Sequence, residues 1–308
     1  MRSIAHTGKS KALYICLVAA PEAVRSKRQI PGQKNKDKKV NTAINKCFQI
    51  GRKFITVAAV ALGAMSMANA QDAKVFQAAG PNSASIQSAV DQFRAALGGA
   101  NNGNAAGPID GGRREINWDG GGSTATAVGP TPFDVFLNNR GNRSTTPGTG
   151  FVQATALGMA DLFVNPSYAT AFAPFSPSRL FSAIGSNITE TSFYVPGHGD
   201  STPAATRGFG VVFSDVDLPD GTGPNSKKGN RHASTLVEYF AVDGSPLFST
   251  LVAASPGDGG LSFIGIVLDD ARIARVKITA GGAIPGEDDA QDVVVMDDFI
   301  YGEPKAIR

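Results

Sequence analysis

The sequence is short of cysteine, of tryptophan and of long apolar runs. The 308 residues contain two cysteines, Cys16 and Cys47, and both precede residue 71. The chain beyond residue 70 therefore has neither a disulfide nor a cysteine nucleophile. That part also lacks an apolar run of about 18 or more residues, the length that a membrane-spanning helix needs. We therefore expect residues 71–308 to form a released domain, large enough to be stable without disulfides.

Charge is scarce as well, at 18% of the residues, and it is unevenly placed. Residues 1–53 hold 13 of the 29 Lys and Arg with only two acids, and residues 54–70 hold no charge. Residues 71–308 are left with 16 basic and 24 acidic residues, a net charge of −8. The overall +3 therefore belongs to the precursor. The acidic domain argues against binding nucleic acid or anionic lipid and favours divalent cations as partners.

A basic pair, an apolar stretch and a small-x-small end follow one another before residue 71. Arg52-Lys53 precede the apolar residues 54–67, and Ala68-Asn69-Ala70 come next. These three parts predict a secretory signal peptide over 46–70 with cleavage after Ala70. A buried core helix at 54–68 is the weaker interpretation, because no neighbouring element would cover it. The protein is expected to be secreted, with no membrane attachment after cleavage.

Residues 1–45 are rich in Lys, Asn and Gln, and we expect them to be a disordered basic extension. A start codon assigned too far upstream explains them better than a cytoplasmic segment on an exported protein. A nucleic-acid role is disfavoured because no aromatic residues are interleaved with the charges.

The pattern beyond residue 70 predicts one helix followed by many strands. Apolar residues recur at helical spacing over Ser83–Leu97, with a start at Pro81-Asn82 and a stop at Gly98-Gly99. A Gly- and Asn-rich stretch, Gly99–Arg114, then reads as a mobile connection. We accordingly divide this part into 71–114, a helix plus connection, and 115–308, a β domain.

From Glu115 onward the period is two, and Gly, Pro, Asn and Asp interrupt it. Arg272–Thr279 places Ala274, Val276 and Ile278 on one face and Arg275 and Lys277 on the other, as in a strand with one wet side. Asp243-Gly244 between two apolar runs predicts a hairpin. The other strands are predicted at Glu115–Trp118, Phe151–Ala156, Thr191–Val195, Gly208–Phe213, Ser234–Val242, Pro246–Val252, Leu261–Leu268 and Val293–Tyr301. The fold class is therefore all-β, an antiparallel β-sandwich or jelly roll with one N-terminal amphipathic helix.

Acidic residues cluster at three places. Asp215, Asp217 and Asp220 lie within one turn, and closely spaced carboxylates of this kind suit Ca²⁺, although the same residues also fit a plain solvated turn. Glu287, Asp288, Asp289 and Asp292 are expected to be a solvated loop.

Asp297 and Asp298 form the third place and lie inside an apolar strand. Alternation puts Asp297 with Val293, Val295, Phe299 and Tyr301, and Asp298 on the other face, so one carboxylate is expected to point into the core. A buried carboxylate needs a partner, either Ca²⁺ or an arginine such as Arg272 or Arg275.

Four segments resemble a known family. They are Gly208-Phe-Gly-Val-Val-Phe213, Leu236-Val-Glu-Tyr-Phe-Ala-Val-Asp-Gly244, Ile273-Ala-Arg-Val-Lys-Ile278 and Val295-Met-Asp-Asp-Phe-Ile300. Their rhythm resembles the closing half of galactose-binding-like jelly-roll domains, where a final strand with Asp-Asp is common and a structural calcium often lies beside it. The stretch is also similar to exported bacterial proteins with a PEP-CTERM sorting tail, but Glu303-Pro304 is followed by four residues and no apolar span. The resemblance implies fold more than ligand.

The common catalytic motifs are absent from the sequence. There is no Gly-x-Ser-x-Gly, no His-Glu-x-x-His and no phosphate loop. His198, Asp200 and Ser201 are triad residue types, but a triad is assembled from separate elements, and an exposed loop is the simpler interpretation. Glu115, Asp119, Glu190 and Glu238 are carboxylates available for glycoside hydrolysis, and nothing singles out a pair. We predict no catalytic residue.

Aromatic residues are the candidates for ligand binding, because sugar C–H faces stack on them. The candidates are Trp118, Tyr194, Tyr239 and Tyr301. Trp118 shares a face with Ile116, which favours a core position for it. The leading hypothesis is a secreted, non-catalytic sandwich, stabilised by Ca²⁺, that binds carbohydrate or another cell-surface polymer. The alternatives are a polysaccharide hydrolase or lyase, and an extracellular structural or matrix protein.

Overall fold

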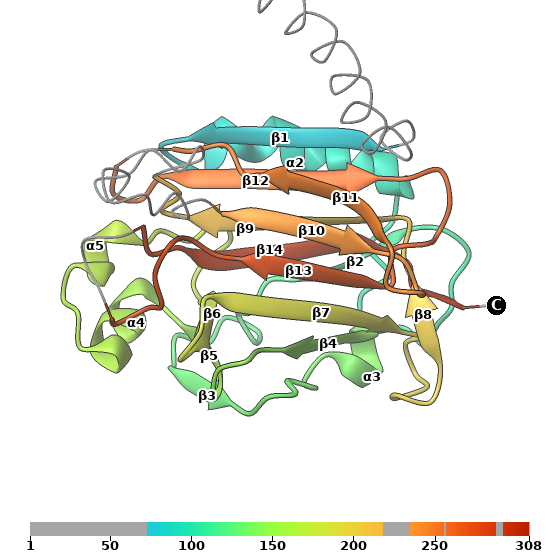
Figure 1. Ribbon diagram of the computed structural model, residues 1–308, viewed down its shortest axis with the longest axis horizontal. Helices are drawn as coiled ribbons and strands as arrows, with labels where there is room; N and C mark the ends of the chain where they lie inside the picture. Colours follow the sequence, from blue (N-terminus) through green and yellow to red (C-terminus); the bar gives the residue numbers. More distant parts are fainter. Residues whose placement is uncertain (1–72, 218–234, 256, 288–291, 308) are drawn as a thin grey trace, which may run out of the picture. The chain divides into compact units, whose positions relative to one another are not determined.

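The computed structural model describes residues 73–217, 235–255, 257–287 and 292–307, and they form two facing antiparallel sheets (Figure 1). Sheet A has the order β1-β12-β9-β14-β6-β5-β3, with β2 also paired to β14. Sheet B has the order β11-β10-β13-β7-β8-β15, with β4 also paired to β7. The predicted all-β sandwich is confirmed.

Sheet A consists of β1 (Lys74–Gly80), β2 (Arg113–Ile116), β3 (Ala127–Gly129), β5 (Gly150–Ala154), β6 (Leu180–Ile184), β9 (Gly208–Ser214), β12 (Leu261–Val267) and β14 (Val295–Gly302). Sheet B consists of β4 (Asn142–Thr145), β7 (Ile188–Tyr194), β8 (Pro203–Ala205), β10 (Leu236–Phe240), β11 (Pro246–Leu251), β13 (Arg275–Thr279) and β15 (Lys305–Ala306). The described helices are α2 (Ser83–Gly98), α3 (Leu137–Arg140), α4 (Ala156–Phe163) and α5 (Tyr168–Ala171).

The main core lies between the sheets and is built by alternation. In β13, Val276 and Ile278 are fully buried while Arg275 and Lys277 are partly exposed, as predicted. The predicted hairpin joins β10 to β11 through Gly244, whose φ of 81° suits glycine. Sheet A is different, because β9, β12 and β14 are buried along both faces. It therefore has a second layer on its outer side.

Helix α2 forms part of that layer. Asn82 caps it by accepting a hydrogen bond from the Ser85 backbone N–H, and Ile86, Val90, Phe93 and Leu97 are buried as the spacing predicts. Helices α4 and α5 cover another part of sheet A, over β5, β6 and β14. Sequence analysis missed them because they are short. None of the described helices is long and apolar enough to span a membrane.

The segment assigned to a separate 71–114 region is built into the sandwich. Strand β1 pairs with β12 along its whole length, and β2 pairs with β14. The Gly- and Asn-rich connection is held by Arg114, whose guanidinium binds both carboxylate oxygens of Glu303 at 2.6 and 2.7 Å and donates to the Gly103 and Ala105 carbonyls. Both side chains are buried, so the connection is anchored at this pair.

Strand β14 contains a β-bulge that overturns the faces expected from simple alternation. Its register with β9 shifts between Met296 and Phe299. As a result Met296 and Phe299 both face the core between the sheets, whereas Val295 lies on the outer side with α4 and α5. The prediction that Val295 and Phe299 share a face is therefore wrong, because the two aspartates between them occupy the bulge.

Two glycines make room for α2 on sheet A. Gly210 in β9 and Gly265 in β12 are direct partners in register, and a Cβ on either would lie 2.8 Å from ring atoms of Phe93. Phe93 is fully buried and makes edge contacts with Phe76 and Phe263. A Cβ at either glycine would therefore press on a ring that is already packed.

We predict that Gly265→Ala lowers the free energy of unfolding by about 1–3 kcal/mol, because it overpacks the helix interface. Chemical denaturation measures this. Phe93→Leu should relieve the clash, so the double variant should lose less stability than the sum of the two single variants. Additive losses would show that the glycine does not act through Phe93.

Candidate functional site

Trp118 and Tyr239 cannot serve as ligand platforms in this structure, because both are fully buried. Trp118 stacks on Phe181 with ring centres 3.7 Å apart, and its indole N–H donates to the Asp297 carbonyl at 2.9 Å. The Tyr239 hydroxyl donates to the Phe209 carbonyl. Tyr301 is buried too. Of the predicted aromatic residues, only Tyr194 keeps an exposed edge.

Tyr194 lies on the outer face of sheet B, beside a row of side chains in register across four strands. Phe240 of β10 pairs with Arg275 of β13, Arg275 pairs with Ser192 of β7, and Ser192 pairs with Arg143 of β4. We call these four residues the Ser192 row. All four are partly exposed, so the row is open to solvent.

Each arginine of the Ser192 row contacts an aromatic ring. The Arg275 guanidinium lies 4.0 Å from the centre of the Phe240 ring, and that of Arg143 lies 5.2 Å from the centre of the Tyr194 ring. Arg143 also donates to the Tyr194 hydroxyl at 3.3 Å. Two hydrogen bonds to Asp134, at 2.7 and 2.9 Å, raise the pKa of Arg143 above its usual range. Each of the two aromatic residues is therefore held by an arginine, Phe240 across the strands from Ser192 and Tyr194 two residues along β7.

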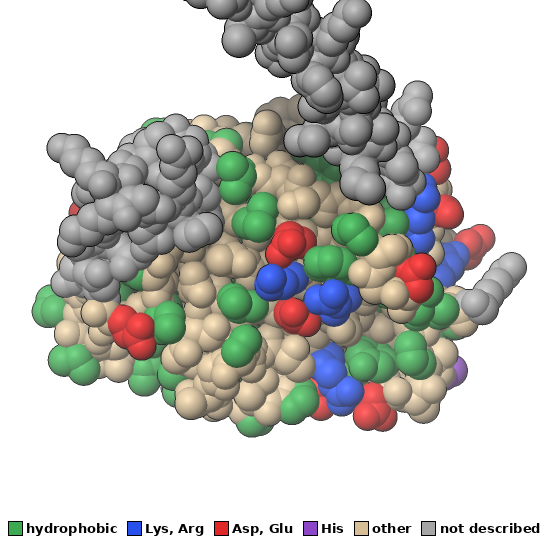
Figure 2. Space-filling model, in the orientation of Figure 1, with side chains coloured by type: hydrophobic (Ala, Val, Ile, Leu, Met, Phe, Trp, Pro, Cys, Tyr) green, Lys and Arg blue, Asp and Glu red, His purple; other side chains and the backbone are tan. Residues whose placement is uncertain are grey.

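A second row runs parallel to the first and consists of ion pairs. Glu238, Lys277 and Glu190 are successive register partners on β10, β13 and β7. Lys277 binds Glu238 at 3.2 Å, and Glu190 binds Arg275 of the Ser192 row at 3.1 Å. Figure 2 shows acidic and basic side chains alternating near the middle of this face. The outer face of sheet B is thus polar, with both signs of charge.

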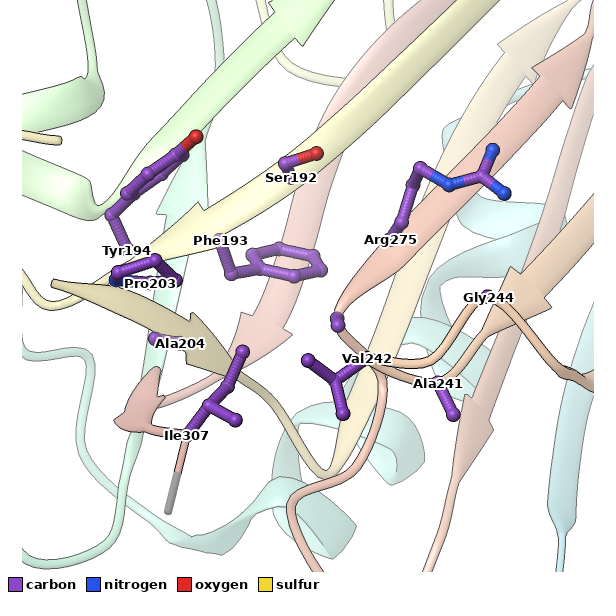
Figure 3. A pocket seen from close by; sticks show the side chains of 11 residues that line it. Ser192, Phe193, Tyr194, Pro203, Ala204, Ala241, Val242, Gly244, Arg275 and Ile307 are labelled. Atoms are coloured by element: carbon purple, nitrogen blue, oxygen red, sulfur yellow. The ribbon is translucent and has the colours of Figure 1, made fainter.

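Two neighbouring hollows lie near this face, and Ser192 and Arg275 of the Ser192 row line the first of them. The first, of about 240 Å³, has Tyr194 and Arg275 on opposite sides and Val242 and Ile307 along the other edge (Figure 3). The second, of about 350 Å³, shares Ala241, Val242 and Ile307 with the first. Val242 is 63% exposed, which gives the wall between the hollows an apolar surface.

The acidic turn after β9 brings together more carboxylates than its sequence suggests. Burial together with the nearby charges of Asp217, Asp292 and Asp258 raises the pKa of Asp215 to about 8. The Asp217 backbone N–H donates to the Asp292 carboxylate, and the Asp217 carboxylate accepts from the Gly257 N–H. Asp292 was predicted to lie in a solvated loop, but it is buried here. Asp220 lies outside the described residues.

Calcium binding at these carboxylates stays a prediction. Among residues 73–217, 235–255, 257–287 and 292–307, no three His, Cys, Asp or Glu side chains form a group that could hold a metal ion. Asp215, Asp217 and the Asp297–Asp298 pair therefore do not converge on one described site.

Asp297 and Asp298 both turn to the outer side of sheet A, so neither points into the core between the sheets. Asp297 accepts from the backbone N–H groups of Phe175 and Ser176, at 2.6 and 3.2 Å. Asp298 accepts from the Ser176 hydroxyl at 2.7 Å. The arginine near them is Arg94 of α2, 3.6 Å from Asp298, and not Arg272 or Arg275 as the sequence suggested. A helix that packs across the sheet supplies the charge.

Burial dominates the titration of this pair. It raises the pKa of Asp297 well above the usual range of a carboxyl group, with a further rise from the charge of Asp298. Burial also raises the pKa of Asp298 to about 6, although the hydrogen bond from Ser176 and the charge of Arg94 act in the opposite direction. Arg94 is shared with Glu115 of β2 at 2.8 Å. The pair therefore has partners that a structural role requires.

The loop with His198 does not form a catalytic triad. The Ser201 hydroxyl donates to the His198 backbone carbonyl at 2.6 Å, and Asp200 lies 3.4 Å from Arg143. Neither group is directed at the imidazole ring. His232 lies outside the described residues.

Comparisons with known proteins found no match. The chain matches no protein-family model, no curated protein and no solved structure. The functional assignment therefore depends on the geometry described above.

We predict that Asp298→Asn changes how stability depends on pH. The folded protein holds the Asp298 proton with a pKa of about 6, and an unfolded chain holds it with a pKa of about 3.9. The stabilisation from this proton is complete below about pH 4 and is lost as pH rises through about 6. The melting temperature of the variant, measured relative to the parent protein, should therefore rise between about pH 4 and pH 7.

Asp91→Asn is the matched control, because Asp91 also contacts Arg94 but its side chain is 58% exposed. The melting temperature of Asp91→Asn, plotted against pH, should run parallel to that of the parent protein. A parallel profile for Asp298→Asn as well would contradict the prediction.

Proposed function

We propose that the protein is a secreted, non-catalytic β-sandwich that binds carbohydrate or another cell-surface polymer on the outer face of sheet B. The observation that carries this proposal is the Ser192 row together with Tyr194 beside it, where two arginines contact two aromatic rings on the partly exposed face of sheet B and an open hollow adjoins Ser192 and Tyr194. The predicted signal peptide supports an extracellular location.

The chemistry of the row suits a sugar polymer. The C–H face of a sugar ring packs on an aromatic side chain, and guanidinium and hydroxyl groups hydrogen-bond to its hydroxyls. Ser192 is small, so it leaves space for a sugar ring beside Tyr194 in the first hollow. The rigid strands fix these groups before the ligand arrives, which lowers the entropy lost on binding. The resemblance to galactose-binding-like domains points to the same ligand class.

We predict that Tyr194→Ala weakens binding of the best ligand on a glycan array by about tenfold, because it removes one stacking surface. Val164→Ala removes an 87% exposed apolar side chain that is outside the Ser192 row and should leave binding unchanged. The same ligands are incubated with the protein and examined for shortened products. Absence of glycan binding would refute the proposal, and product release would favour the hydrolase or lyase alternative.

Calcium is proposed as a stabilising ion at Asp215 and Asp217. Burial and, to a smaller extent, the charges of Asp217, Asp292 and Asp258 raise the pKa of Asp215, and a divalent cation would relieve the repulsion among these carboxylates. Carboxylate oxygens are the ligands that Ca²⁺ prefers. The resemblance also implies a structural calcium, although it places the ion beside Asp297 and Asp298, where Asp297 Oδ2 and Asp298 Oδ1 already accept hydrogen bonds and Asp297 Oδ1 is buried without one.

We predict that about 1–5 mM Ca²⁺ raises the melting temperature and that chelation reverses the rise. Binding must displace the Asp215 proton, so the rise should be larger at about pH 9 than at about pH 6. Asp215→Asn should abolish the response, while Asp91→Asn on α2 should keep it. An equal response in Asp215→Asn would place the ion elsewhere.

A further inference from the structure

The charged side chains around the two hollows are all cationic. Arg275 lines the first hollow, and Arg272 and Lys305 line the second. No carboxylate is among the described residues that line either hollow. This runs against the composition of residues 71–308, where 24 acidic residues outnumber 16 basic ones. The two hollows are therefore a local positive site on an acidic domain.

These cations have acidic partners that an incoming anion can replace. Arg275 binds Glu190 at 3.1 Å, Arg272 binds Asp270 at 2.7 Å, and Lys305 binds Asp110 at 3.1 Å. The Asp270 side chain is 68% exposed, and that of Asp110 is fully exposed. Ion pairs this close to solvent contribute little to stability, so a ligand carboxylate can replace one of the partners.

The polar side chains in the hollows favour an anionic ligand over a neutral one. Arginine and lysine donate hydrogen bonds and accept none, and the other polar side chains of the lining are the hydroxyls of Ser192 and Tyr194. Only these two hydroxyl oxygens among the lining side chains can accept a hydrogen bond from a neutral sugar. Guanidinium groups match the two oxygens of a carboxylate.

The two hollows are placed to hold successive sugar units. They share the wall formed by Ala241, Val242 and Ile307, so they are direct neighbours, and a polymer that spans this wall would reach both. Tyr194 and the exposed Val242 provide apolar surface for the ring faces, as Figure 3 shows for the first hollow. Cations occur in both hollows. Acidic groups on consecutive sugars would therefore meet a positive side chain in each.

We propose that the ligand is an acidic polysaccharide, bound along the two hollows with its carboxylate groups at Arg275, Arg272 and Lys305. This inference rests on the proposed function and names the ligand class. The acidic groups give selectivity, and the Ser192 row supplies the stacking surface.

The test measures binding of the whole protein to oligogalacturonate, to hyaluronan and to a mannuronate oligomer, each beside its neutral form with the carboxyl groups methyl-esterified or reduced. Any acidic oligomer that binds is expected to bind at least about tenfold more tightly than its neutral form. This difference in affinity should shrink as the salt concentration rises from about 50 to 500 mM. Arg275→Gln and Lys305→Gln should each weaken binding of the acidic form about tenfold, and Lys305→Gln, which lies outside the Ser192 row, should leave binding of the neutral form unchanged. Arg275→Lys keeps the charge and should lose less.

Lys74→Gln is the matched control, since it removes one positive charge from β1 at the edge of sheet A. It should leave the preference unchanged. Melting temperatures establish that each variant is folded. Polyglutamate, an acidic polymer without sugar rings, should bind weakly, and binding as tight as that of the oligosaccharides would overturn the assignment to a polysaccharide.

The outcomes separate this inference from the function that it rests on. Neutral glycans that bind as well as acidic ones would overturn the inference and leave the proposed function standing. Acidic glycans that bind equally to Arg275→Gln and Lys305→Gln would overturn the assignment to the hollows. No binding to any glycan, neutral or acidic, would overturn both.

Discussion

Strand β14 must bury two carboxylates in the middle of sheet A, and the surrounding elements meet that requirement. The bulge at Asp297 and Asp298 frees a carbonyl, which the Trp118 indole satisfies, and directs both side chains to the outer side. There the backbone before β6 and the Arg94 guanidinium of α2 provide donors and charge. Removing any one of these partners would leave a buried polar group unsatisfied. The same polar contacts therefore fix the bulge, the helix and the only tryptophan.

The helices that cover the outer face of sheet A determine which sheet face remains open to solvent. Helix α2 packs over β1, β9 and β12, and helices α4 and α5 pack over β5, β6 and β14. The Ser192 row lies on the opposite sheet, whose strands β7, β10 and β13 alternate strictly between buried and partly exposed residues. Alternation of this kind keeps alternate side chains in solvent and holds them on a rigid scaffold. The polar face of sheet B is thus a consequence of the one-sided helical layer.

The fold was predictable from sequence wherever a local period determines it. Alternation located β13 and its wet face, and helical spacing located the buried residues of α2. The bulge was not predictable, because the register shift depends on pairing with β9, far away in the sequence. Long-range pairing also explains why Arg94 was missed as the partner of Asp298, and why Asp292 was not assigned to the turn of Asp215. For the candidate site, the aromatic residue type identified Tyr194 as a candidate. Its arginine neighbours were not predictable, because register across four strands brings them together.

The two charged regions of the domain lie at opposite ends of the sandwich, and this separates their roles. Asp215 follows the last residue of β9, whereas Arg272 and Ala205 line a hollow near its first residue, Gly208. A strand of 7 residues is about 23 Å long, more than twice the Debye length of about 8 Å at physiological salt. The acidic turn therefore neither attracts nor repels a ligand in the hollows to a useful degree. A cation bound there would act on stability alone, and the positive hollows can select an anionic polymer even though residues 71–308 carry a net charge of −8.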